Sequence, residues 1–497
     1  MVSELTGAQE RAGTLTYSAA KAEAYVNMQL KHLSQSVLVK KVGIWVVSTL
    51  LLFFGFYTNL WHVAEQQWFA NHQKDTEAHI MGRMVKSRQD GIFSAGGLNG
   101  WGTAKSTDAE WIPSTELGPQ YTAYLYKLSF EKFSTYNSQP GGQGMIFSLL
   151  DRRIPFSPQT KLKLFYVLTA LLSAIALTAI IGWFYEEFGG WVAMFVTGSA
   201  MLSQWLTVFG KNLWWSLWAF YLPMIAVLYF FKHNRVPANR QFIRFGILIF
   251  IAVSIKCFIN GYEYITTTLL MMMVPFVYYV ILDRWSRRQC MKWTLAAGLG
   301  SGVAIFLSLI MLCFQIGAAK DGFMDGVGHV IWSFGKRTYG DAENFPPVYA
   351  ASLEAGTIGV VITYMNGIFF DLNNYLSQTN AFVSNFLLKV RYYYLIVLFI
   401  VMSAVLFLRS RKMVAERRQH YIALIWTTWF SILAPLSWFV IFKAHSYIHT
   451  HMSFLLWQMP FTLFGFAVFG SAIIAWKKTQ SQVLTNEANG QSRMEDA

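Results

Sequence analysis

The sequence predicts an all-α polytopic membrane protein, and two observations indicate this class. Of the 497 residues, 54% are hydrophobic and 17% aromatic, whereas only 13% are charged, about half the charged share of an ordinary soluble domain. The apolar residues are gathered in runs close to the length of about 20 residues that a helix needs to cross a bilayer core. With so few charges the chain cannot cover a water-facing surface, so we expect lipid to be its main solvent.

About ten apolar runs are candidates for membrane-spanning helices. They are 42–61, 164–184, 191–210, 216–231, 245–260, 265–282, 293–316, 392–408, 421–442 and 453–476. No small-residue cleavage pattern follows the first run, which we therefore interpret as an uncleaved anchor. The polar residues 1–41 and 477–497 then flank a membrane domain, and the composition of the last segment is typical of a disordered tail.

Basic residues predict the topology, because Lys and Arg are retained on the cytoplasmic side of a membrane. If the N-terminus is inside, the short link 185–190 carries Glu186 and Glu187, and the other inner loops are basic. These loops carry Lys232, Arg235, Arg240, Arg244, Arg284, Arg287, Arg288, Lys292, Arg409, Arg411, Lys412, Arg417 and Arg418. The short outer loops hold little more than Lys211 and Lys443. We therefore expect both termini in the cytoplasm and attribute the net charge of +14 to topology, not to a nucleic-acid partner, which needs cations on one exposed face.

Two long polar segments then lie at the outer face, 62–163 and 317–391. Within the second, the moderately apolar piece 356–370 is short and carries Asn366. We interpret it as interfacial or re-entrant, because a full crossing would place the basic cluster 409–418 outside.

The first outer segment offers the clearest candidates for catalysis, Asp75 and Glu77. Apolar residues at roughly helical spacing follow them, at Met81, Met84, Val85 and Ile92, which predicts a short helix on the outer membrane surface. Asp75 and His79 are four residues apart and share a helix face. A carboxylate there is suited to accept a proton from a substrate hydroxyl. The alternative is structural, with Asp75 as an N-cap and Glu77 complementing the helix dipole.

At this point the chain resembles the GT-C superfamily of integral membrane glycosyltransferases. The resemblance rests on the layout of the helices and on Asp75, Glu77, Arg83, Ser87 and Gly91 in the first outer loop. It implies that an acid of this loop is the catalytic base and that the donor is a sugar carried on a polyprenyl phosphate. Family members commonly have adjacent acids, whereas here Thr76 separates them, so either Asp75 or Glu77 matches the base. The acceptor would be a glycan or lipid at the outer face of a bacterial cytoplasmic (inner) membrane.

Such a reaction also needs cations to stabilise the departing phosphate. The candidates are Lys256, Lys211, Lys443, His445, Arg152 and Arg153. Lys256 is the most informative, because an ammonium inside an apolar run is costly unless it reaches water or an anion. The alternative for Lys256 is that it extends along the helix to the nearby outer boundary.

Two outer turns offer groups for a sugar or acceptor. Tyr262 and Glu263 combine a ring face with a carboxylate, although aromatic residues at this depth also form interfacial belts. His449 and His451 follow His445 in the last outer loop and suit sugar or phosphate contact, interfacial packing or, less well, a divalent metal. No carboxylate or thiolate in that loop completes a ligand set, so we predict no metal. The three cysteines, Cys257, Cys290 and Cys313, suggest neither a disulfide framework nor a zinc site.

Two other classes of protein remain alternatives. A secondary transporter also has about ten helices, but it usually shows internal repeats, which this sequence lacks. An envelope polysaccharide polymerase or ligase uses lipid-linked sugars too, yet it generally relies on a large late loop, whereas the largest loop here comes first.

Overall fold

The computed structural model describes residues 39–104, 117–235, 238–320, 322–376 and 380–476. Seven of its helices are long and apolar enough to cross a membrane. They are Val39–Thr58, α7 (Pro158–Phe188), α11 (Gln241–Asn260), α12 (Ile265–Leu282), α13 (Arg287–Ala319), α17 (Tyr392–Ser410) and Ala415–Ile441, the last made of α18 (Ala415–Ser431) and α19 (Leu433–Ile441). This confirms the all-α polytopic class. Residues 1–38 and 477–497, which hold most of the predicted termini, lie outside the described residues.

Four further helical pieces are bent or short. The pair α8 (Gly190–Met201) and α9 (Gln204–Gly210) is bent by 70°, and Pro347–Glu354 with α16 (Thr357–Met365) by 81°. If each bent pair is one span, up to nine spans are long enough in the described chain. α10 (Leu217–His233) and Phe461–Trp476 are apolar but shorter. All ten predicted runs therefore fall on helical segments, although length and composition support only seven to nine spans.

Capping residues define where the long helices begin and end. Ser157 accepts a hydrogen bond from the backbone N–H of Thr160, and Pro158 occupies the first turn of α7, where its missing N–H costs nothing. Gly189 ends the same helix at φ +91°, a conformation that L side chains rarely adopt. Ser286 and Gln289 form a reciprocal capping box at the start of α13.

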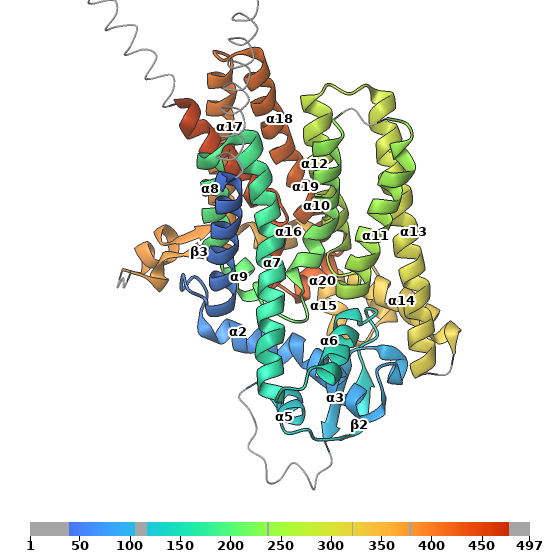
Figure 1. Cartoon of the computed structure of the whole chain (residues 1–497). Helices are drawn as coiled ribbons and strands as arrows, with labels where there is room; N and C mark the ends of the chain where they lie inside the picture. The colour runs from blue at the N-terminus through green and yellow to red at the C-terminus, as the bar shows by residue number, and fades with distance from the viewer. Residues whose placement is uncertain (1–38, 105–116, 236–237, 321, 377–379, 477–497) are drawn as a thin grey trace, which may run out of the picture.

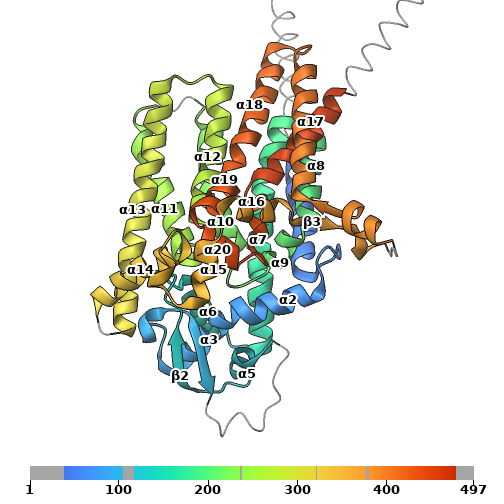
Figure 2. The same cartoon turned by 180° about the vertical axis from the view of Figure 1, so that it is seen from behind.

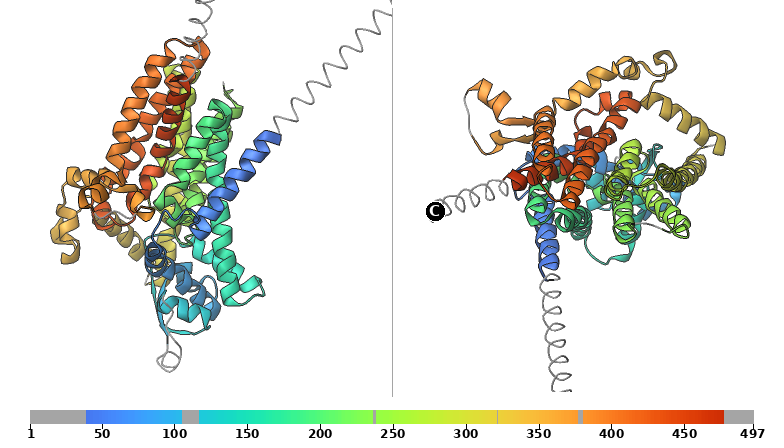
Figure 3. Two further views of the ribbon diagram at one scale, coloured as in Figure 1. Left: turned by 90° about the vertical axis from the view of Figure 1, so that its left-hand side faces the viewer. Right: turned by 90° about the horizontal axis from the view of Figure 1, so that it is seen from above.

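The bundle has two different ends. The α12–α13 and α17–α18 connections lie at one end, and the first polar segment lies at the opposite end (Figure 1). Figure 2 and Figure 3 show the same separation from other sides. Cations of the predicted inner loops form ion pairs at the end with the connections, where Arg235 lies 3.0 Å from Asp283 and Lys41 lies 3.2 Å from Glu186. The basic loops are thus gathered at one end, as the topology prediction requires.

The first polar segment folds into a small α/β unit beneath the bundle. Its elements are α2 (Gln66–His72), the π-helical turn η1 (Gln73–Glu77), α3 (Ala78–Asp90), η2 (Ser94–Gly97), β1 (Gly100–Ala104), α5 (Pro119–Leu125), β2 (Phe130–Thr135) and α6 (Gly142–Arg153). β1 and β2 pair antiparallel with Gly100 opposite Thr135. Gly82 of α3 packs directly on β1, since a Cβ there would lie 2.1 Å from the Gly100 carbonyl oxygen.

The helix α3 differs from the predicted surface helix. Met81, Met84 and Val85 are buried at the predicted helical spacing, but Arg83 is buried as well. Arg83 donates from Nε to Ser87 Oγ at 2.9 Å and from Nη2 to the Gly91 carbonyl at 3.3 Å. The helix is therefore internal to the α/β unit, not laid on a membrane surface. Arg83, Ser87 and Gly91, on which the resemblance to the GT-C superfamily partly rests, form one hydrogen-bonded cluster that holds the end of α3.

The second polar segment runs along the same end of the bundle. It contains α14 (Phe323–Arg337), η3 (Ala342–Asn344), η4 (Pro347–Tyr349), α15 (Ala350–Glu354), α16, β3 (Ile368–Asp371), η5 (Leu372–Asn374), η6 (Val383–Leu387) and β4 (Lys389–Arg391). The nine residues of α16 extend about 14 Å, less than half of a bilayer core of about 30 Å. β3 and β4 pair antiparallel with Ile368 opposite Arg391, so the chain leaves and rejoins the bundle at one level. This arrangement favours the interfacial or re-entrant interpretation of 356–370.

Candidate active site

Six of the polar residues singled out in the sequence converge on one cavity of about 330 Å³. The cavity lies between η1, the start of α3, the α11–α12 turn and the segment that follows α20 (Lys443–Ile448). Its lining consists of Asp75, Thr76, His79, Tyr136, Trp214, Trp215, Glu263, His445, His449, His451 and Met452. Segments that are far apart in the chain therefore supply one polar site, which we name the histidine cavity.

Asp75 and His79 form one wall of the histidine cavity. Asp75 is exposed, whereas His79 packs edge-on against Trp101, with ring centroids 4.7 Å apart. The Nδ1 atom of His79 lies 3.2 Å from the carbonyl oxygen of Thr76. Burial lowers the pKa of His79 to about 4, so this imidazole is neutral at physiological pH. Asp75 is thus a carboxylate beside a neutral ring in a site that a ligand can enter.

Glu263 forms the opposite wall and sits between two nitrogen groups. Its Oε1 atom lies 3.7 Å from Nη2 of Arg337 and 3.7 Å from Nε2 of His445. Its Oε2 atom is buried without a hydrogen-bond partner among the described residues. A buried carboxylate oxygen without a donor is costly. The geometry therefore leaves an acceptor position for a ligand hydroxyl.

The three histidine rings lie in a row along the cavity, with neighbouring ring planes tilted by 44° and 58°. The ring centroids of His445 and His449 are 4.3 Å apart, and those of His449 and His451 are 5.5 Å apart. Burial lowers the pKa of all three rings, that of His449 to about 3. The Nδ1 atoms of His445 and His449 have no partner within the described chain. The rings are therefore neutral hydrogen-bonding groups, not cations.

Among the described residues, no group of three or more His, Cys, Asp or Glu side chains is placed to hold a metal ion.

Glu77 occupies a separate and fully enclosed position. Its Oε2 atom accepts hydrogen bonds from the hydroxyls of Tyr121 at 2.5 Å and Tyr166 at 2.9 Å, and its Oε1 atom accepts from the backbone N–H of Leu213 at 2.7 Å. Its exposed fraction is 0%, and it does not line the histidine cavity. Burial raises the pKa of Glu77 to about 7, although these donors and the nearby Lys211 oppose the change. The two acids of the split pair therefore have different surroundings.

Most of the predicted phosphate-binding cations lie elsewhere. Lys256 donates to the carbonyl oxygens of Gly261 at 2.7 Å and Glu263 at 2.6 Å. It is fully buried and holds the turn that carries Glu263. The alternative prediction was that Lys256 extends along the helix toward water. The structure instead turns its ammonium toward these two carbonyls. This geometry does not support direct contact between Lys256 and a phosphate.

The remaining cations also contact the protein itself or solvent. Lys211 donates to the Tyr57 carbonyl at 3.0 Å, and Lys443 donates to the carbonyl oxygens of Leu353 and Ala355 at 2.6 and 2.8 Å. Arg152 and Arg153 are exposed at the end of α6, away from the histidine cavity. Of the six predicted phosphate-binding residues, only His445 lines this cavity.

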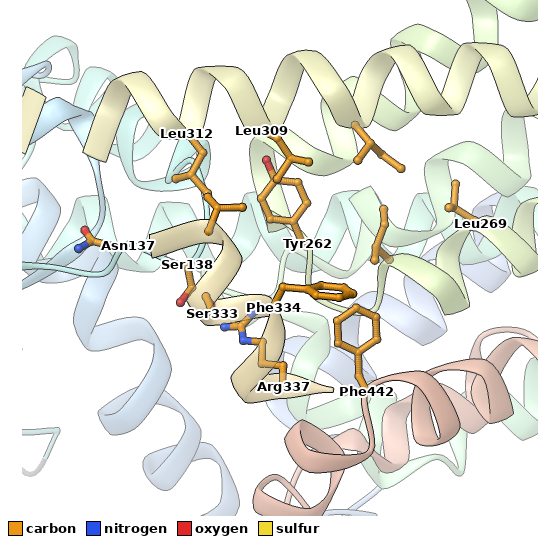
Figure 4. Close-up of a pocket in the computed structure, with 13 residues that line it drawn as sticks. Asn137, Ser138, Tyr262, Leu269, Leu309, Leu312, Ser333, Phe334, Arg337 and Phe442 are labelled. Atoms are coloured by element: carbon orange, nitrogen blue, oxygen red, sulfur yellow. The ribbon is translucent and has the colours of Figure 1, made fainter. Parts of the chain in front are cut away.

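A second, apolar cavity of about 240 Å³ adjoins the first. Figure 4 shows Tyr262, Phe334 and Phe442 pointing into it, with Ser333 and Arg337 at one side. Apolar side chains of α12, α13 and α14 form much of the remaining lining, to which Asn137 and Ser138 add polar groups. The Tyr262 hydroxyl lies 3.0 Å from Ser308 Oγ, so its ring is fixed as a wall of this cavity. Tyr262 therefore faces the apolar cavity, whereas its neighbour Glu263 faces the polar one.

Arg337 is the residue that sequence reasoning missed. It lines the apolar cavity, and its guanidinium reaches Glu263 of the histidine cavity. It is buried although it ends the amphipathic helix α14. The sequence carries no local signal of this position, because the contact joins Arg337 to Glu263, about 74 residues earlier in the chain. Arg337 thus lies where the two cavities meet.

Comparisons of the chain with protein-family models, curated proteins and solved structures found no match. The class of this protein is therefore stated from its fold and its cavities alone. The protein is a polytopic helical membrane protein with a polar cavity and an adjoining apolar cavity at one end of its bundle.

Proposed function

We propose that this protein is an inverting membrane glycosyltransferase that takes a sugar from a polyprenyl-phosphate donor, with Asp75 as general base. The observation that carries the proposal is the shared boundary of the two cavities at Glu263 and Arg337. An amphipathic donor needs an apolar chamber, a cation at its mouth and a polar chamber beyond it. The acceptor is a glycan or lipid at the outer face of a bacterial inner membrane.

The residues at the boundary support such a donor. The apolar cavity has the chemistry of a site for the prenyl chain, and the guanidinium of Arg337 suits bidentate binding of a phosphate. In this proposal Arg337 replaces Lys256 as the main phosphate-binding residue. The neutral rings of His445 and His449 provide hydrogen-bond donors or acceptors to the sugar. Glu263 accepts from a sugar hydroxyl through its unpartnered oxygen.

The proposed reaction is a direct displacement. Asp75 accepts the proton of an acceptor hydroxyl as its oxygen bonds to the anomeric carbon of the donor sugar. The bond from this carbon to the phosphate oxygen breaks, and both electrons leave with polyprenyl phosphate. Arg337 stabilises the charge that develops on that phosphate. Attack from the side opposite the leaving group inverts the anomeric centre.

The test is direct consumption of a lipid-linked sugar by purified protein in lipid nanodiscs. Mass spectrometry first identifies any polyprenyl-phosphate sugar that co-purifies, and release of polyprenyl phosphate from that lipid is then followed with time. We expect Asp75→Asn to abolish release and Arg337→Met to raise the KM for the donor. Arg152→Met is the matched control, since Arg152 is exposed and outside both cavities. A wild-type protein that neither carries nor consumes such a lipid would refute the proposal, and a bound small solute would favour a transporter.

A further inference from the structure

A third cavity, of about 340 Å³, lies apart from the candidate active site. It is enclosed by α2, the start of α9, the end of α16, the β3–β4 hairpin and the first residues of η7 (Ser453–Gln458). Its lining differs from that of the apolar cavity, because carboxylates, cations and amides all contribute to it. We name it the hairpin cavity.

Aromatic rings form one wall of the hairpin cavity. Trp68 and Trp205 meet edge to face with ring centroids 5.4 Å apart, and Trp205 lies 5.1 Å from Phe454. The indole N–H of Trp205 donates to the Ile368 carbonyl at 2.9 Å, which fixes this ring against β3. Trp205 is buried, whereas Trp68 is partly exposed. Trp205 is therefore fixed in the wall, whereas Trp68 and Phe454 both keep part of their surface exposed, and Trp68 is the larger of these two rings.

Three polar side chains beside this wall each donate to a backbone carbonyl and keep other hydrogen-bonding groups available. Gln204 donates through its amide to the Ile368 carbonyl at 2.9 Å, and Asn374 donates in the same way to the Val63 carbonyl at 3.2 Å. Each amide thereby keeps its carbonyl oxygen as an acceptor. Arg391 donates from Nη1 to the Asn366 carbonyl at 2.7 Å, which leaves further N–H groups of the same guanidinium.

Charges of both signs complete the cavity. The carboxylates of Glu65 and Asp371 lie in the same lining as the cations of Lys389 and Arg391. A phosphate or another simple anion would meet the two carboxylates, and an acyl chain would leave all four charges without water. A sugar ring fits better, because its hydroxyls both donate and accept while its C–H face packs on an aromatic ring.

We propose that the hairpin cavity binds a sugar unit of an oligosaccharide, with the ring stacked on Trp68. Its role as an acceptor site rests on the proposed glycosyltransferase function. Two chain segments connect it with the histidine cavity. α2 carries Trp68 and continues into the turn of Asp75, and Met452 lines one cavity while Phe454 lines the other. An oligosaccharide with one unit held at Trp68 would therefore extend from this separate cavity toward the proposed base.

The experiment is calorimetric titration of the full-length protein in nanodiscs, without donor, with maltohexaose, chitohexaose and hexagalacturonate. We expect at least one of these probes to bind at millimolar concentration or below. Trp68→Ala should weaken that binding at least about tenfold, as truncation of a central aromatic contact does. Glu65→Gln should weaken the binding of the probe less. Because Glu65 is exposed, this variant tests the cavity even if Trp68→Ala does not fold.

Two controls separate this site from the proposed reaction. Trp191→Ala removes a 65% exposed tryptophan at the start of α8, outside the hairpin cavity, and should leave binding unchanged. Arg152→Met, at an exposed position outside all three cavities, should also bind normally. The inference is overturned if none of the three probes binds, or if the probe that binds does so equally well to the wild type, Trp68→Ala and Glu65→Gln. A failure of the transfer assay with intact probe binding would reject only the proposed function.

Discussion

Asp75 and Glu77 are two residues apart, yet they lie in opposite kinds of surroundings. Asp75 is exposed at the wall of a polar cavity, whereas Glu77 is enclosed and accepts three hydrogen bonds. Those bonds come from α5, α7 and the segment between α9 and α10. Glu77 therefore attaches the turn of Asp75 to the bundle. Under the proposed function Asp75 is the general base, whereas the hydrogen bonds of Glu77 give it a positioning role.

The largest expected effect is on the transfer rate, which substitution of Asp75 should lower without lowering the melting temperature. Asp75→Asn should lower the transfer rate by roughly 100- to 10,000-fold, the usual contribution of a general base. Its melting temperature should stay close to that of the wild type. Glu77→Gln should keep most of the transfer activity, because the amide oxygen still accepts hydrogen bonds. Rates of polyprenyl phosphate release, measured beside melting curves, test both statements. The reverse pattern would make Glu77 the base.

Removal of the acceptor at position 77 should have the next largest effect. Glu77→Leu removes the shared acceptor of the Tyr121 and Tyr166 hydroxyls and of the Leu213 N–H. The two hydroxyls lie 3.4 Å apart and can still pair with each other, whereas the buried Leu213 N–H loses this acceptor, a loss that costs roughly 1–3 kcal/mol. We expect a strongly lowered melting temperature and poor yield of folded protein. Asp75→Leu is the matched control, because its position is exposed. Equal melting temperatures for the two leucine variants would contradict the anchoring role.

The titration of Glu77 offers a subtler test of the same anchor. Burial raises its pKa from 4.5 to about 7, so the folded state holds this proton more tightly than the unfolded state does. Below pH 4.5 both states are protonated, and above pH 7 both are ionised. Between these limits the folded state loses stability as the pH rises, by on the order of 3 kcal/mol in total at about 1.4 kcal/mol per pKa unit.

Glu77→Gln should remove this pH-dependent part. Melting curves of the wild type and the variant at several pH values between 4.5 and 7 provide the measurement. We expect the difference in melting temperature, wild type minus variant, to fall steadily across this range. A constant difference would show that Glu77 titrates alike in both states.

Local patterns in the sequence predicted part of the fold and of the candidate site. Composition and run length predicted the helical membrane class, and the four-residue spacing of Asp75 and His79 placed both at one cavity. The burial of Glu77 depends on Tyr121, Tyr166 and Leu213, which are 44, 89 and 136 residues away. No periodicity within 62–163 encodes such contacts. The same reason explains why the position of Arg337 beside Glu263 became visible only in the folded chain.

Lys256 shows the opposite situation, in which the partners are local but a single pattern allowed two interpretations. Its acceptors are five and seven residues ahead, on the turn that follows its own helix. The apolar run around it suggested either an anion or a path to water. Backbone carbonyls of the turn after the helix accept hydrogen bonds from the ammonium instead. This makes Lys256 a structural counterpart of Glu77 on the other side of the histidine cavity.

The smallest expected effect follows from that role. Lys256→Met removes two hydrogen bonds from a charged donor but also the cost of burying the charge, so we expect a net loss of about 2 kcal/mol. Because the turn carries Glu263 and Tyr262, a loosened turn should lower kcat and raise the KM for the donor together, by a similar modest factor. Melting curves and donor kinetics test this, with Arg152→Met as the exposed control. A selective rise in the KM for the donor at unchanged stability would return Lys256 to the phosphate site and weaken the assignment to Arg337.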